Sequence, residues 1–383
     1  MKYVELGKVA DVNWGDTSVT KASYVEDGYP AFSATGSDGL LPYFDFDREG
    51  IVLSAIGARC GKTWFATGKW SVIKNTIRFW SESSELNNRY LYWLTADPEF
   101  WPKRGAAQPF ITIGDARKLK IPLPPLEEQK RIAAILDQAD ELRRKRQRAL
   151  DRLGQLGQAI FIEMFGDPAT NTMGWPHIAL VDCCAQLDDI RCGPFGTQLL
   201  REEFQETGVP LWGIKQVNRG FSILTHEYVT PNKARELSNY DIVEDDIVMT
   251  RKGTIGNCAV YPKGFPSGIM HSDLLRVRLD RAKAMPQFIA DQLHFSRDIQ
   301  RQIELISGGA IMQGINVGKL KKIKILLPPL ALQVTYAERI TVLGIQASSM
   351  KKCLHSAEAL FTSLQHRAFN GDLTTSSLKE AAP

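Results

Sequence analysis

The string GARCGKT at residues 57–63 is the stretch of the chain that comes closest to a phosphate-binding loop. Such a loop needs four residues between its glycines and a helix that opens at the Lys. Here three residues separate Gly57 from Gly61, and residues 64–68 are not typical of a helix start. The matching string at residues 253–257, GTIGN, has no Lys. A shared turn, in which Gly adopts conformations that other residues rarely reach, accounts for both strings better than nucleotide binding does.

Motifs for hydrolytic or nucleophilic catalysis are equally scarce. The six His residues form no H-E-x-x-H array, and no G-x-S-x-G elbow occurs. His271-Ser272-Asp273 is a compact polar triplet, but neighbours in sequence rarely point at one another, so a turn or surface site is favoured over a triad. The Asn-Pro-Pro-aromatic string that handles a base amino group in adenine methyltransferases is also missing. We therefore predict that the chain performs no chemistry itself.

The residue types that suit binding to duplex DNA are better represented. Arg and Lys can grip phosphates or pair with guanine edges, and Asn and Gln can pair with adenine. Loops that mix these residues with aromatics and Gly occur in both halves of the chain. The candidate DNA-binding residues of the first half are Arg59, Lys62, Lys74, Asn75, Arg104 and Gln108. Those of the second half are Lys215, Gln216, Asn218, Arg219, Arg251, Lys252 and Gln313. An ordinary surface position is the alternative for each of them.

One long predicted helix, Glu127 to Phe165, organises the sequence around these loops. A Pro pair at 124–125 marks its entrance, and Gly166-Asp167-Pro168 marks its exit. Apolar residues recur in steps of three and four, the seam of a coiled coil, with an interruption at Arg146. The seam residues are Ile132, Ile135, Ala139, Leu142, Ala149, Leu153, Leu156 and Ile160. An apolar seam of this length needs a partner helix.

The partner is predicted within the same chain, because the pattern recurs 204 residues later. The string ILLPPL at 325–330 matches IPLPPL at 121–126, and a Gln follows each, Gln129 or Gln333. The second seam is Ile340, Leu343, Ala347, Met350, Leu354, Ala357, Phe361, Leu364 and Ala368. Basic runs at 117–120 and 319–322 stand at equivalent places. A repeat of this kind predicts the order globule, helix, globule, helix.

Each globule is predicted to be α+β, with short elements and many loops. Strands are expected over 51–56, within 71–80 and over 246–250. Helices are expected over 86–94 in the first globule and over 287–306 in the second. The spacing of these segments does not determine the order of the strands in a sheet.

The composition fits an ordinary folded protein with room for two or three domains. The 383 residues are 44% hydrophobic and 23% charged, and the net charge is +4. The six Cys form no C-x-x-C pair, which favours reduced thiols. The chain begins without an apolar leader, and it has no uninterrupted apolar run of about 18 residues. We therefore expect a soluble cytoplasmic protein with no membrane partner.

These features resemble the specificity subunit of type I restriction-modification systems. The string LPPLEEQ at 123–129 leads into a heptad helix that carries Ile135-Leu136-Asp137 and ends in Phe-Gly-Asp. Gly193-Pro194-Phe195-Gly196-Thr197 and the string VMTRKGTIG at 248–256 resemble the target recognition domains of that family. The resemblance covers nearly the entire chain. The second helix departs from it, since it lacks the Glu pair found at 127–128.

The resemblance implies a fold and a set of partners. Residues 1–121 and 171–327 would be two α/β target recognition domains, and residues 122–170 and 328–383 two conserved helices. The helices would form an antiparallel intramolecular coiled coil with a pseudo-two-fold internal repeat. Each recognition domain would read one half of a bipartite double-stranded DNA target. Two modification subunits with S-adenosylmethionine would dock on the chain, and restriction subunits with ATP and Mg²⁺ would complete the nuclease. No cofactor is expected in this chain.

Two other classes of function remain open at this level. The chain could be a coiled-coil scaffold or adaptor that binds proteins and has no DNA specificity. Alternatively, it could be an enzyme that uses residues 57–63 to bind a nucleotide. Salt-dependent DNA binding argues against the first class, and ATP-binding calorimetry on the chain tests the second.

Overall fold

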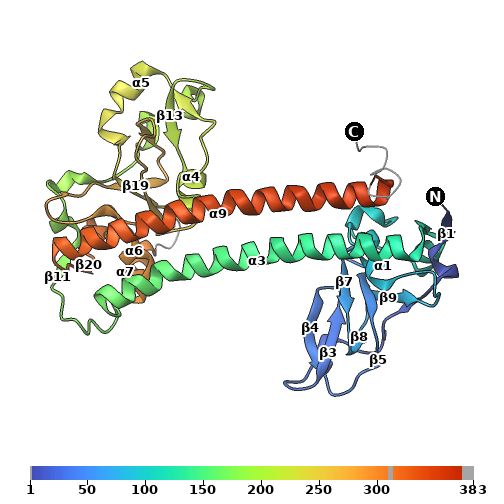
Figure 1. The fold of residues 1–383 in the computed structure, drawn as a ribbon. Helices are drawn as coiled ribbons and strands as arrows, with labels where there is room; N and C mark the ends of the chain where they lie inside the picture. Colours follow the sequence, from blue (N-terminus) through green and yellow to red (C-terminus); the bar gives the residue numbers. More distant parts are fainter. Residues whose placement is uncertain (1, 309–313, 373–383) are drawn as a thin grey trace, which may run out of the picture. The chain divides into compact units, whose positions relative to one another are not determined.

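The computed structural model describes residues 2–308 and 314–372. The chain divides into two compact units. Unit 1 comprises Met1–Arg148 and Lys351–Pro383, and unit 2 comprises Ala149–Met350. Each unit therefore contains a globular part and one half of each of the two long helices, which are α3 (Leu126–Phe165) and α9 (Leu330–Asn370) (Figure 1).

Unit 1 contains two four-stranded sheets and a separate strand pair. One sheet has the order β2-β9-β6-β7 and the other β4-β3-β8-β5, while β1 pairs with β10. All neighbouring strands are antiparallel except β3 and β8, which are parallel. The strands are β1 (Tyr3–Glu5), β2 (Ala10–Trp14), β3 (Tyr29–Ser33), β4 (Gly36–Leu41), β5 (Phe46–Asp47), β6 (Gly50–Ser54), β7 (Thr63–Ala66), β8 (Lys69–Val72), β9 (Thr76–Ser81) and β10 (Lys120–Pro122). The short helices are α1 (Asn88–Thr95) and α2 (Ile113–Lys118).

Unit 2 repeats this topology strand for strand. Its sheets have the orders β12-β19-β16-β17 and β14-β13-β18-β15, β11 pairs with β20, and β13 and β18 are parallel. The strands are β11 (His177–Ala179), β12 (Ile190–Cys192), β13 (Val209–Trp212), β14 (Tyr228–Val229), β15 (Asp241–Ile242), β16 (Ile247–Thr250), β17 (Cys258–Val260), β18 (Gly268–Met270), β19 (Leu274–Val277) and β20 (Lys324–Leu326). The short helices are α4 (Ile214–Asn218), α5 (Pro231–Glu236), α6 (Pro286–Phe295), α7 (Arg297–Ser307) and α8 (Val317–Leu320). The internal repeat and the α+β class predicted from the sequence are confirmed.

The central strand of each unit is buried on both faces. In β6, Ile51 and Leu53 point into the core beneath α1 and α3, whereas Val52 points into the core between the two sheets. In β16, Ile247 and Met249 face the helices and Val248 faces the second sheet. Because side chains alternate along a strand, a strand between two apolar layers reads as a continuous apolar run. This is why the sequence marks these two strands clearly. Figure 1 shows the resulting layers of unit 1, with β3, β4, β5 and β8 furthest from α3.

The two long helices pack together in both units. In unit 1 the Arg143 guanidinium of α3 lies 4.9 Å from the ring centre of Phe361 of α9. In unit 2 the rings of Phe161 and Tyr336 are 5.5 Å apart. An early residue of one helix thus meets a late residue of the other, so the helices are antiparallel as predicted. Gly166 and Gly371, which have positive φ angles, follow the two helices and end them.

Two sequence predictions about the helices are wrong in detail. Leu142 and Leu156, assigned to the first seam, are 40% and 43% exposed. The partly buried seam positions there belong to Arg143 and Gly157, one residue further along. The helix predicted over 287–306 is two helices, α6 and α7, because Ser296 is extended and its hydroxyl caps α7 by accepting from Ile299 N at 3.3 Å.

Residues 2–308 and 314–372 contain no helix with the length and hydrophobicity that a membrane span needs. Within the same residues, no cluster of three or more His, Cys, Asp or Glu side chains is arranged to hold a metal ion. All six cysteines are free thiols. Burial raises the pKa of the Cys183 thiol to about 11 and that of Cys184 to about 12, so neither is a reactive thiolate near neutral pH.

Candidate nucleic-acid interface

The candidate side chains of unit 1 follow the ends of parallel strands. The carboxyl ends of β3 and β8 lie at one edge of the sheet, because these two strands are parallel neighbours. Residues 33–35 leave β3 there and residues 73–75 leave β8. Both segments line a hollow of about 320 Å³, and Lys74 and Asn75 are among its lining residues.

Three hydrogen bonds join the other candidates of unit 1 to this edge. Arg59 Nη1 donates to Thr35 O at 2.9 Å, and Ala55 N donates to Asn75 O at 3.0 Å. Gly57 N donates to Pro109 O at 2.9 Å, which ties the loop at 104–110 to the turn at 55–62. The structure thus gathers the six predicted residues of the first half into one group of loops. We name these loops the unit 1 loop edge.

The side chains of the unit 1 loop edge differ in whether they are already hydrogen-bonded within the protein. The Lys74 side chain is exposed and makes no hydrogen bond or ion pair with the described residues, whereas its backbone N donates to Val19 O at 3.4 Å. Asn75 is also exposed, and its φ of +69° is in the left-handed region, which costs energy in a residue other than Gly. Arg104 pairs with Asp115 at 2.6 Å, and this hydrogen bond lowers the pKa of Asp115. Lys74 and Asn75 are therefore the side chains best placed to meet a ligand.

A polar network supports the floor of this edge. Asp38 accepts hydrogen bonds from Lys21, Thr35, Tyr24 and Ser33. Burial by itself would raise the pKa of Asp38, but the hydrogen bonds, that from Lys21 foremost, outweigh it and lower the pKa to about 2. The carboxylate is therefore ionised at neutral pH and holds the residues that follow β3 in place.

The equivalent edge of unit 2 has the same main-chain frame. β13 and β18 are parallel, and a hollow of about 330 Å³ lies beyond their carboxyl ends, lined by residues that include Lys215, Gln216 and Asp273. Arg251 N donates to Asp273 O at 2.7 Å, as Ala55 N does to Asn75 O in unit 1. Lys252 Nζ pairs with Asp273 Oδ1 at 3.1 Å. We name these loops the unit 2 loop edge.

The structure separates the seven predicted residues of unit 2. Lys215 and Arg219 are exposed on α4 and at its end. Asn218 Oδ1 accepts from Thr254 Oγ1 at 2.8 Å and from Asn257 Nδ2 at 2.7 Å, which ties α4 to the turn after β16. Gln313 lies outside the described residues.

Gln216 requires a correction. Its side chain is buried, with Oε1 accepting from Gly213 N at 3.2 Å and Nε2 donating to Leu224 O at 3.3 Å. The amide keeps one further donor and one further acceptor site, but the side chain is buried and both polar atoms are already bound to the backbone. The structure therefore argues against Gln216 as a DNA-reading residue.

Two residues of the unit 2 loop edge were not among the candidates. Phe195 stacks on Arg251, with its ring centre 4.9 Å from the guanidinium carbon. Asp273 accepts from Lys252 and lies in the hollow. The string Gly193-Pro194-Phe195 was a usable signal for the first, but nothing in the sequence places Asp273 beside Lys252.

Residues 271–273 and 57–63, the two strings that come closest to catalytic motifs, lack the geometry of those motifs. His271 receives its contacts from Ser272 and Asp273 at a single ring nitrogen, Nδ1, at 3.5 and 3.3 Å, whereas a triad uses both nitrogens. Residues 57–63 lead into strand β7 and not into a helix. Gly61 N bonds to Ser54 O at 2.9 Å, and Gly256 N bonds to Thr250 O at 3.0 Å, so residues 57–63 and 253–257 form related turns, of which the second is one residue shorter.

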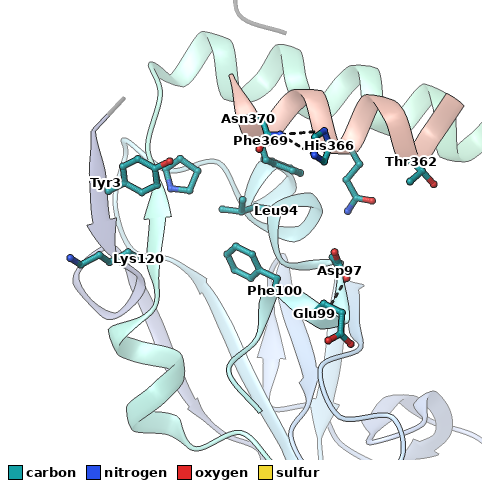
Figure 2. A pocket seen from close by; sticks show the side chains of 12 residues that line it. Tyr3, Leu94, Asp97, Glu99, Phe100, Lys120, Thr362, His366, Phe369 and Asn370 are labelled. Atoms are coloured by element: carbon teal, nitrogen blue, oxygen red, sulfur yellow. Dashed lines mark hydrogen bonds between the residues drawn. The ribbon is translucent and has the colours of Figure 1, made fainter. Parts of the chain in front are cut away.

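The largest of the described hollows lies elsewhere in unit 1. It has a volume of about 470 Å³ and lies between the end of α9 and the segment after α1. Figure 2 shows Phe100 and Leu94 on one side of it, with Phe369 and His366 of α9 opposite. None of the candidate DNA-binding residues lines it. The loop edges, and not this hollow, are therefore the candidate interface.

Comparisons with known proteins agree with this arrangement. The family model for the type I restriction modification DNA specificity domain matches residues 1–152 and 192–358. The StySPI specificity subunit of Salmonella potsdam is 26% identical over 282 residues, which is 67% of this chain and 58% of that protein. The EcoKI specificity subunit of Escherichia coli strain K12 is 25% identical over 280 residues, again 67% of this chain and 58% of that protein. The chain thus spans little more than half the length of these two relatives.

A solved structure shares the fold over the full length. The crystal structure of the type I restriction-modification S subunit from M. genitalium superposes with a TM-score of 0.64, at 17% identity, and the match covers 96% of both chains. At this identity the likeness speaks for the fold. The family model, by contrast, matches well over half of the sequence. The chain therefore belongs to the type I restriction modification DNA specificity domain family.

Proposed function

We propose that the chain is the DNA-reading subunit of a type I restriction-modification complex. Residues 1–121 and 171–327 act as recognition domains, and each reads one half of a bipartite duplex target through its loop edge. Residues 122–170 and 328–383 act as the two conserved helical segments. Membership of the specificity family supports this assignment over a protein-binding adaptor without DNA specificity.

The observation that carries the proposal is a repeated scaffold with different side chains at matching places. In unit 1 the backbone N of Ala55 donates to the backbone O of Asn75, and in unit 2 Arg251 N donates to Asp273 O. Arg251 is therefore equivalent to Ala55, and Asp273 to Asn75. Base edges are distinguished by their pattern of donors and acceptors. One scaffold that displays two different sets of donors and acceptors suits a target with two unlike halves.

The partners follow from the same proposal. Two methyltransferase subunits that bind S-adenosylmethionine dock on the helices, restriction subunits that use ATP and Mg²⁺ complete the nuclease, and the complex works in the cytoplasm. The chain itself contributes no catalytic group. Support for docking comes from apolar side chains on the helices that lack cover in the single chain. Val342 and Ile345 of α9 are 54% and 66% exposed and lie on one face of the helix.

Sequencing of methylated adenines in the host genome, with and without the gene for this chain, tests the proposal. We expect one bipartite, asymmetric motif to lose its methylation when the gene is absent. The purified complex should bind that motif, and the binding constant should fall steeply with salt, as expected for contacts to phosphates. An unchanged methylome together with DNA binding that shows neither sequence preference nor salt dependence would support the adaptor instead.

A further inference from the structure

Arg251 is held on two sides at the unit 2 loop edge. Its guanidinium carbon lies 4.9 Å from the ring centre of Phe195, and its Nε donates to Ile315 O at 3.3 Å. The Phe195 ring packs against the guanidinium, and the bond to Ile315 engages its Nε side, so the group is held at two places. Neither Nη donates to another of the described residues. The paired Nη groups thus form a preoriented fork with its donors unused.

The scaffold does not require an Arg at this position. Arg251 N donates to Asp273 O, and Arg251 O accepts from Ile315 N at 3.3 Å. Ala55 of unit 1 makes the same two bonds, to Asn75 O at 3.0 Å and from Ile111 N at 2.8 Å, and it is fully buried. The same main-chain frame therefore forms in unit 1 around a methyl side chain. These two main-chain bonds do not depend on the Arg side chain.

Phe195 is placed by the loop that follows β12. A Cβ on Gly193 would lie 2.1 Å from His271 O, so only Gly allows the loop to approach the end of β18 this closely. Phe195 N then donates to Gln198 Oε1 at 2.9 Å. The ring remains 47% exposed, which is a cost for a large apolar side chain unless it serves the group that stacks on it. That group is Arg251.

Two ligands match a fork of two parallel donors, a phosphate and the O6/N7 edge of guanine. A phosphate can be approached from many directions, so a free Lys or Arg suffices for it. A base edge is planar and must be met in its own plane, which rewards a guanidinium whose plane is fixed beforehand. These observations favour the base.

We propose that Arg251 reads a guanine in the major groove of the half-site bound by unit 2, with Phe195 as the residue that positions it. The inference rests on the proposed function and adds to it the base that is recognised, a guanine, and the residue that recognises it, Arg251. Arg251 is the specificity-determining contact, and Phe195 acts through Arg251 without touching the DNA.

The test uses the full chain in complex with its methyltransferase subunits and the DNA motif found by methylome sequencing. Each guanine of the motif is replaced in turn by 7-deazaguanine, which keeps Watson–Crick pairing but lacks the N7 acceptor. One replacement should weaken binding by the unaltered complex about tenfold, within the range of roughly 5- to 150-fold that a bidentate contact is worth. With Arg251→Ala, which removes the donors and reproduces the side chain of the equivalent Ala55, the two DNAs should bind alike, to within about twofold.

Variants of the positioning residue complete the design. Phe195→Leu should reduce the discrimination against 7-deazaguanine, and Phe195→Tyr, which keeps a ring for the stack, should restore it. Arg235→Ala is the matched control, because Arg235 is an exposed residue of α5 in the same unit whose guanidinium bonds to Asn232. It should leave the discrimination unchanged. Thermal melting of each variant checks that the fold is retained.

The possible failures can be told apart. If the unaltered complex prefers no DNA sequence at all, the proposed function fails and this inference fails with it. If the complex binds its motif but every 7-deazaguanine replacement is neutral, or the unit 2 half-site holds no guanine, only this inference is overturned. The same holds if Arg251→Ala still discriminates as strongly as the unaltered chain.

Discussion

Gln129 holds the start of helix α1 through the backbone of Asn87. Its Oε1 accepts from Asn87 N at 2.9 Å, and its Nε2 donates to Glu85 O at 2.7 Å and to Pro124 O at 2.8 Å. The side chain is fully buried. Gln333 repeats the arrangement in unit 2, accepting from Met285 N at 3.0 Å and donating to Pro328 O at 2.7 Å. The Gln that follows each Pro pair thus links a long helix to the start of the short helix beneath it through hydrogen bonds to the backbone.

Gln129→Ala should destabilise unit 1 by about 3 kcal/mol, because each buried group left without its partner costs about 1–3 kcal/mol. Denaturant unfolding followed by circular dichroism measures the loss. Gln138→Ala, at an exposed position of the same helix, is the control and should change the free energy of unfolding by less than about 0.5 kcal/mol. Equal stability of the two variants would mean that the hydrogen bonds of Gln129 do not stabilise the fold.

Asn75→Gly should separate DNA binding from folding. Gly adopts a φ of +69° without strain and keeps the backbone carbonyl that accepts from Ala55, so the free energy of unfolding should stay within about 0.5 kcal/mol. Loss of the amide should weaken target binding by about 1–3 kcal/mol if Asn75 pairs with an adenine. Fluorescence anisotropy on the motif and on adenine-substituted variants measures this. Unchanged binding would mean that the Asn75 side chain does not contact the DNA.

The Asp38 network predicts a pH dependence of the stability of unit 1. The pKa of Asp38 is lowered from 3.8 to about 2 in the folded chain, so its contribution is present above about pH 4 and is lost as the pH falls towards 2. The stability advantage of the unaltered chain over Asp38→Asn should therefore shrink between pH 5 and pH 3. Urea unfolding of both proteins across this range provides the measurement. An advantage that grows on acidification would contradict the assignment.

Replacing residues 171–327 with the equivalent segment of a relative should alter one half of the methylated motif and leave the other half intact. The physical reason is that the loop edge of unit 2 is built from that segment alone, as the hydrogen bonds of Arg251, Asn218 and Asp273 show. Methylome sequencing of a strain that carries the chimera reads out both halves at once. A change in both halves would rule out one reader for each half-site.

Several features of this protein were determined by its sequence alone. The Pro pairs, the glycines after Phe165 and Asn370, and the three-four apolar spacing identify both long helices, because these signals act between near neighbours along the chain. The recurrence after 204 residues identifies the repeat for the same reason. Strands β6 and β16 were found because burial on both faces leaves a continuous apolar run.

Only the tertiary structure decided which side chains meet. The strand order, with β3 beside β8 and β13 beside β18, depends on hydrogen bonds between distant segments that no local pattern encodes. The equivalence of Ala55 and Arg251 likewise rests on their bonds to residues far along the chain. Gln216 was chosen by residue type, yet packing buries it, and the stack of Phe195 on Arg251 brings together two loops that are separate in sequence. Residue type proposes a binding group, but long-range packing decides whether that group faces the ligand.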